Sequence, residues 1–315
     1  MRKQLKKIQS YFYSPTPGYP LAALRIVLGI AMLTEAVRLF PFLEELYGQF
    51  GYLQAKLIEA LTGPAIPGFF LDRGIDSDLY MSGFRLFYFL HIVFILAFTL
   101  GFKTRFSVVA VWFCQTILIN SGYFSSYGVD RYFQIFTFLM IFMPIGNVWS
   151  VDRQRSGRPA PTQTSCTFSL RLLQILLLAT YANAGLAKTS GTDWWSGEAI
   201  WRVLNSPEFS DLNFLWLAQF PLIAKALCWG TLVIETFYIV GYFVPRIGRY
   251  WALSIVLMHL GIAALVGLGL FGLTLAAVNT VVLLLPGLEW RPSFLQSKLN
   301  WLFIPHAKVS PYRRS

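Results

Sequence analysis

The sequence predicts an all-α integral membrane protein, a polytopic bundle of about eight transmembrane helices. Of its 315 residues, 56% are hydrophobic and only 13% are charged, and the apolar residues gather in long runs. A soluble domain has about 25% charged residues. The chain therefore has too few charges to cover a surface that faces water on all sides.

Eight apolar runs are expected to form the spans, because a helix of about 20 residues crosses the hydrocarbon core of a bilayer. The expected spans are residues 21–39, 82–102, 106–124, 132–148, 169–187, 222–243, 250–267 and 270–285. Seven spans would leave the basic C-terminal tail on the outer side, which makes that count the weaker alternative.

The net charge of +11 is read as a sign of topology. With eight spans, most of the 26 Lys and Arg residues fall on the side of the N-terminus and most acids fall on the other side. Short basic loops stay in the cytoplasm. Both termini are therefore expected in the cytoplasm. The membrane is expected to be a cell membrane, namely a bacterial inner or plasma membrane. The basic face is expected to meet the lipid bilayer, and no nucleic acid partner is expected.

Two long connections, 40–81 and 188–221, are expected on the outer side, each with an interfacial helix. Apolar side chains recur there at helical spacing: Leu43, Leu46, Tyr47, Phe50 and Leu53 in the first, and Ile200, Trp201, Val203 and Leu204 in the second. These helices either roof an outward-facing cavity or only anchor the connections. The expected organisation is a basic cytoplasmic segment (1–20), one transmembrane domain (21–286) and a basic cytoplasmic tail (287–315).

Polar side chains inside the spans indicate where function lies, because an ionisable group at bilayer depth costs about 2.5 to 3.5 kcal/mol. All but Arg25, which is expected to snorkel inward, fall at mid-depth or in the outer half, and they predict a polar site that opens outward. The members are His91, Glu235, His259, Glu35, Asn120, Asp130, Asn183 and Lys188.

Several of these side chains keep a structural alternative. Glu35 can pair with Arg38, Glu235 can be a neutral acid or the partner of His259, and His91 can be a packed core residue. No metal site is expected from three histidines and three separated cysteines.

Lys188 ends the fifth expected span, on one helix face with Tyr181 and Ala184. Small Ala184 and Gly185 leave room below the amine either for a flat ligand or for a closely packed helix. A desolvated lysine can act as a base, whereas a lysine that snorkels to the interface has no chemical role.

The run Tyr181-Ala-Asn-Ala-Gly-Leu-Ala-Lys188, followed by Asp193-Trp194 and Gly197, resembles the signature of the membrane domain of the vitamin K-dependent gamma-carboxylase. Leu100-Gly101 with Arg105-Phe106-Ser107, and Trp149-Ser150-Val151-Asp152, look like two further landmarks of that family. Segments 194–209 and 259–275 are similar to the membrane proteins that mature sporulation-delaying-type peptide toxins. Both groups belong to the horizontally transferred transmembrane (HTTM) family, which the chain resembles over most of 15–286.

The resemblance implies a membrane enzyme in which Lys188 deprotonates reduced vitamin K or menaquinol, with O2 and CO2 as co-substrates and a secreted peptide as the substrate. Protons or the peptide would be handled by Glu235, His259 and Asp130. Contacts to the cofactor would come from Tyr181, Asn183, Ala184, Gly185 and Trp194. Val129 stands where the carboxylase has a functional histidine, and no large lumenal domain is expected after the last span, so an orthodox carboxylase of clotting-factor type is not expected.

The resemblance also leaves a second class open. In this alternative the chain is a non-redox component for the maturation or export of a secreted peptide toxin, acting with a small partner protein. A plain transporter is the weakest of the three hypotheses, because no inverted repeat stands out.

Overall fold

The computed structural model describes residues 9–48, 51, 60, 72–121, 126–207, 212–244 and 247–287. Helices make up most of these residues, and the only β pairing among them is an isolated bridge between Thr16 and Gln163. The predicted all-α class is confirmed.

Each expected span has a matching helix. These are α2 (Tyr19–Leu39), α6 (Ser77–Leu100), α7 (Thr104–Ser121), α8 (Gly128–Ile141), α10 (Thr164–Thr189), α13 (Pro221–Thr236) followed by α14 (Tyr238–Phe243), α15 (Gly248–Leu265), and α16 (Gly269–Asn279) followed by the π-helical turn η3 (Thr280–Leu284) and α17 (Leu285–Gly287). Four described segments are long and apolar enough to cross a membrane: Tyr19–Tyr47, Ser77–Leu100, Thr164–Thr189 and Gly248–Leu265. The chain is thus a membrane protein, and the count of eight spans stays a prediction.

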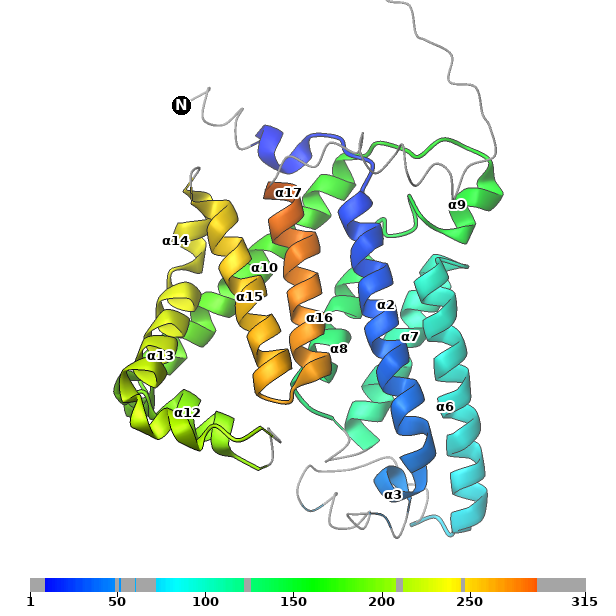
Figure 1. Cartoon of the computed structure of the whole chain (residues 1–315). Helices are drawn as coiled ribbons and strands as arrows, with labels where there is room; N and C mark the ends of the chain where they lie inside the picture. The colour runs from blue at the N-terminus through cyan, green and yellow to red at the C-terminus, as the bar shows by residue number, and fades with distance from the viewer. Residues whose placement is uncertain are drawn as a thin grey trace, which may run out of the picture.

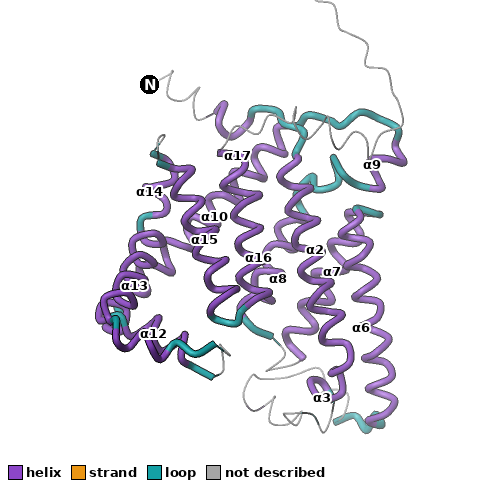
Figure 2. The backbone as a smooth tube through the Cα atoms, in the orientation of Figure 1, coloured by secondary structure: helices purple, strands orange, loops and turns teal. Residues whose placement is uncertain are grey.

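The long helices run between two ends of the bundle (Figure 1). One end carries α9 (Val151–Ser156) and the other carries α3 (Leu43–Tyr47) and α12 (Glu198–Asn205); we call them the α9 end and the α12 end. Helix α2 packs on α6 and α16, α7 packs on α6 and α8, and α10 packs on α13. Figure 2 shows that the loops gather at these two ends.

The two expected interfacial helices are partly visible. The second is α12, preceded by the short helix α11 (Thr192–Ser196). The first is limited to α3, and its expected continuation through Phe50 and Leu53 lies outside the described residues. Both lie at the α12 end, opposite the connections that are expected in the cytoplasm.

At the α9 end, the two further landmark motifs, in residues 100–107 and 149–152, meet in one structure, which we call the Arg25 clamp. The carboxylate of Asp152 accepts hydrogen bonds from the backbone N–H of Lys103 at 2.8 Å and of Thr104 at 2.7 Å. The backbone N–H of Asp152 donates to the carbonyl of Gly101 at 3.1 Å. Gly101 has a φ of +67°, and a Cβ there would overlap Ser150 and the guanidinium of Arg25.

Arg25 itself does not snorkel, contrary to expectation. Its side chain is 0% exposed, and its guanidinium donates to the carbonyl of Ile145 at 2.8 Å and to that of Trp149. Backbone carbonyls thus supply the acceptors that water would otherwise supply, so the cation can stay inside the bundle. These bonds hold α2 against the connection between α8 and α9.

Candidate functional site

Lys188 and Glu235 form an ion pair at the α12 end. Lys188 lies in the last turn of α10 and Glu235 in the last turn of α13, and Nζ of the lysine donates to Oε2 of the glutamate. Their side chains are 24% and 7% exposed. The alternative pairing of Glu235 with His259 is not seen.

Gly185 explains why α10 and α13 come so close. A Cβ at this position would overlap the backbone nitrogen of Thr236. Of the two alternatives for the small residues, Gly185 therefore serves close helix packing rather than space for a ligand. Ala184, its neighbour, is half-buried.

Trp194 covers the lysine from α11. Nζ of Lys188 lies 5.4 Å from the centre of the Trp194 ring, a cation–π distance. The turn after α11 requires Gly197, because its φ is +94° and a Cβ would lie 2.9 Å from the backbone of Lys225. Arg202 on α12 is ion-paired with Asp193 at 2.7 Å, so the aspartate of the Asp-Trp motif fixes α11 on α12.

A second set of hydrogen bonds lies deeper in the bundle. The hydroxyl of Tyr181 is 2.7 Å from Nε2 of His259 and accepts a hydrogen bond from Nδ2 of Asn279 at 2.6 Å. All three side chains are buried, and His259 Nδ1 and Asn279 Oδ1 have no hydrogen-bond partner. Asn279 directly precedes the π-helical turn, a feature often found at functional sites. Asn279 was not among the expected site residues, although an amide inside an apolar run is a signal that the sequence offers.

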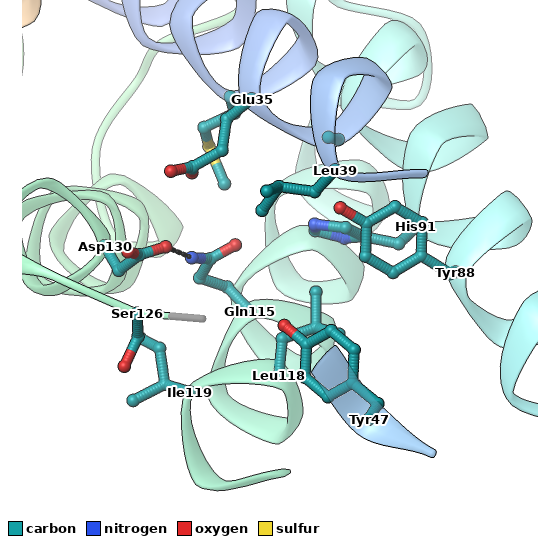
Figure 3. Close-up of a pocket in the computed structure, with 12 residues that line it drawn as sticks. Glu35, Leu39, Tyr47, Tyr88, His91, Gln115, Leu118, Ile119, Ser126 and Asp130 are labelled. Carbon is teal, nitrogen blue, oxygen red and sulfur yellow. Dashed lines mark hydrogen bonds between the residues drawn. The ribbon is translucent and has the colours of Figure 1, made fainter. Parts of the chain in front are cut away.

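Asp130 lies in a different group of side chains from Lys188. Its carboxylate accepts hydrogen bonds from Nε2 of Gln115 at 2.9 Å and from the backbone N–H of Tyr127 at 2.8 Å. It lines a pocket together with Glu35 and His91 (Figure 3). All three were expected in a polar site that opens outward, but they were not expected to form a site apart from Lys188.

Two further expectations concern Arg38 and Asn183. Arg38 is exposed and forms no ion pair with Glu35, so that structural alternative is not seen. Asn183, expected to contact a cofactor, is exposed, whereas Tyr181 and Gly185 on the same helix are buried. Within the described ranges, no group of three or more His, Cys, Asp or Glu side chains is arranged to hold a metal ion.

A family model described as HTTM domain matches residues 13–286. The chain belongs to the HTTM family. The match covers the Lys188 pair, the Tyr181 group and the pocket of Asp130, so all three are parts of the HTTM domain. Searches among curated proteins and among solved structures gave no significant match.

Proposed function

We propose that this HTTM protein is a membrane enzyme that uses a quinol to modify a peptide at the α12 end of the bundle, with Lys188 as the base. The observation that carries the proposal is the Lys188–Glu235 pair, an amine hydrogen-bonded to a buried carboxyl group beneath an indole ring. An acid–base pair in a place of low dielectric is an expensive arrangement to keep without a chemical role.

The residues around the pair fit the hydroxyl group of a quinol. The lysine is still 24% exposed, so a ligand can reach its amine. Oγ1 of Thr236, next in the chain to Glu235, is buried without a hydrogen-bond partner. Trp194 adds a flat aromatic surface for a ring. In the related carboxylase a reduced vitamin K, together with O2, supplies the strong base that allows CO2 to add to a peptide glutamate.

The chain itself supplies the first proton transfer. Burial favours the neutral form of a carboxyl group, so Oε2 of Glu235 can take up a proton from Nζ of Lys188 across their hydrogen bond. The amine then accepts the proton of the quinol hydroxyl at Nζ. The ring of Trp194 lies over this amine and covers part of it.

The test uses the full chain in lipid nanodiscs with reduced vitamin K or menaquinol, O2, bicarbonate and a glutamate-containing peptide. We expect the quinone epoxide to form, and Lys188→Ala to lower its rate by about 100-fold or more, the usual contribution of a general base. Lys225→Ala is the matched control, because Lys225 also lies over an indole, 5.1 Å from the ring of Trp229. No epoxide from the unaltered protein, or equal loss in both variants, contradicts the proposal.

One observation favours a second candidate function. Lys188 is already neutralised by Glu235, as in a purely structural pair. In a non-redox component for the maturation or export of a secreted peptide, deletion of the gene abolishes processing of the peptide, while Lys188→Ala is tolerated. Normal processing in the deletion strain counts against this function.

A further inference from the structure

The pocket of Asp130 is separate from the Lys188 pair and is built by five elements. Glu35 comes from α2, Tyr47 from α3, His91 from α6, Gln115 from α7 and Asp130 from α8 (Figure 3). We call it the Glu35 pocket. The rest of its wall is mainly apolar and includes Met32, Leu39, Leu118 and Ile119.

Two buried carboxyl groups share this pocket without a cation. Glu35 is 7% exposed and Asp130 is 5% exposed, and the two side chains interact with each other. In the part of the chain that the structure describes, neither forms an ion pair with Lys, Arg or His. Two adjacent carboxyl groups cannot both stay ionised in a buried place, so either a shared proton or a bound cation has to neutralise one of the two charges.

His91 is the second observation that points to a ligand. The side chain is 2% exposed, its Nδ1 has no hydrogen-bond partner, and its ring nitrogens point toward the pocket in Figure 3. A buried polar group without a partner costs about 1 to 3 kcal/mol. Asp130 is already held in place by Gln115 and Tyr127, so the pocket is formed in advance and not by the ligand.

The acceptors match the ammonium group of an alkyl amine. An ammonium group has three N–H donors and no acceptor, and Glu35, Asp130 and His91 can each accept one. Among the described residues, no group of three His, Cys, Asp or Glu side chains could hold a metal ion. The ring of Tyr88 on the pocket wall also suits a cation.

We propose that the Glu35 pocket binds the primary ammonium group of an alkyl amine, with the alkyl chain against Met32, Leu118 and Ile119. The amine is either a free molecule or the side chain of a peptide lysine. Tyr47 of α3 lines the pocket, and α3 lies at the α12 end of the bundle. The proposal is independent of any quinol chemistry.

The test titrates the full chain in nanodiscs with n-butylammonium by isothermal titration calorimetry. We expect saturable binding that Glu35→Gln weakens at least tenfold, with tetramethylammonium, which lacks N–H donors, failing to bind. Glu44→Gln is the matched control, because Glu44 is an exposed carboxylate at the same end, paired with Arg85. Equal binding of both cations, no saturable binding, or full binding by Glu35→Gln overturns the proposal.

Two further measurements make the test robust. Asp130 also accepts from the backbone at the start of α8, so Asp130→Asn is used only if its thermal unfolding matches that of the unaltered chain. Glu35 has no such role at the start of a helix, so the result for Glu35→Gln decides the test. Tighter binding of an N-acetyl-lysine amide than of n-butylammonium identifies a peptide lysine as the source of the amine, and the reverse order identifies a free amine.

Discussion

At the scale of single residues, Arg25 and Asp152 show that a family motif can hold the fold together without taking part in a reaction. Arg25 binds the carbonyl of Ile145, and Asp152 binds the backbone of Lys103 and Thr104. The landmark motifs around Gly101 and Trp149 are therefore explained by the contacts of the Arg25 clamp. The sequence could not predict this, because the partners of Arg25 are carbonyls more than 100 residues away along the chain.

Asp152 makes stability depend on pH. Burial would raise its pKa, but the hydrogen bonds from Thr104 and Lys103 and the charge of Arg25 prevail and hold the pKa below its usual value. The carboxylate therefore stabilises the folded state above the unfolded pKa of about 3.9, and this contribution is lost as the pH falls through the lower folded pKa.

We expect Asp152→Asn to lower the free energy of unfolding at pH 7 by about 1.5 kcal/mol, the low end for hydrogen bonds to a charged group. Chemical unfolding in detergent, followed by tryptophan fluorescence between pH 3 and 7, measures the difference from the unaltered chain. This difference should shrink toward pH 3. Glu45→Gln, a change at an exposed carboxylate, serves as the control, and a difference that stays constant with pH contradicts the prediction.

At the scale of elements, the contact between α10 and α13 sets the geometry of the candidate site. Gly185 lets the two helices approach until Lys188 meets Glu235. The sequence predicts Glu235 near mid-depth and Lys188 at the outer edge of the membrane, since depth can be read along an apolar run. It could not choose their partners, because spans are apolar on nearly all sides and the pattern does not say which faces meet.

Helix boundaries also depend partly on contacts that the sequence pattern does not show. Helix α8 begins at Gly128, ahead of the expected start at residue 132, because the Asp130 side chain accepts from the N–H of Tyr127 and caps the first turn. The expected sixth span is divided between α13 and α14 at Phe237. Length and hydropathy predicted that these helices exist, but capping and tertiary contacts decide where they begin and break.

Gly185→Ala tests the helix contact. The added Cβ has to push α13 away from α10, so we expect a loss of about 1 to 3 kcal/mol in the free energy of unfolding, as for overpacked cores. Gly230→Ala on α13 is the control, because nothing lies within 4 Å of a Cβ there. That change should be neutral or slightly stabilising, since alanine favours a helix more than glycine. Equal stability of both variants, measured by thermal unfolding in nanodiscs, contradicts the assignment of Gly185 to helix packing.

At the scale of the whole molecule, the two ends of the bundle differ in character. The α9 end carries the Arg25 clamp, and the α12 end carries the Lys188 pair and the amphipathic helix α12. The all-α class and the membrane character were predictable from the composition and the long apolar runs. The meeting of helices from distant parts of the sequence, as in the Glu35 pocket, was not.

Cysteine labelling in intact cells tests the expected orientation. We expect Ser190→Cys, at the exposed end of α10, to react with a membrane-impermeant maleimide, and Arg158→Cys, between α9 and α10, to react only after lysis. The native cysteines Cys114, Cys166 and Cys228 are buried and give little background. The opposite labelling pattern would reverse the predicted topology.

The Arg25 clamp has a consequence for traffic through the bundle. It ties α2 to the connection between α8 and α9 at the α9 end, through the carbonyls of Ile145 and Trp149. The hydrogen bonds of the clamp thus fix the α9 end, whereas the Lys188 pair lies at the α12 end. Movements that would admit a substrate or release a product are therefore expected at the α12 end.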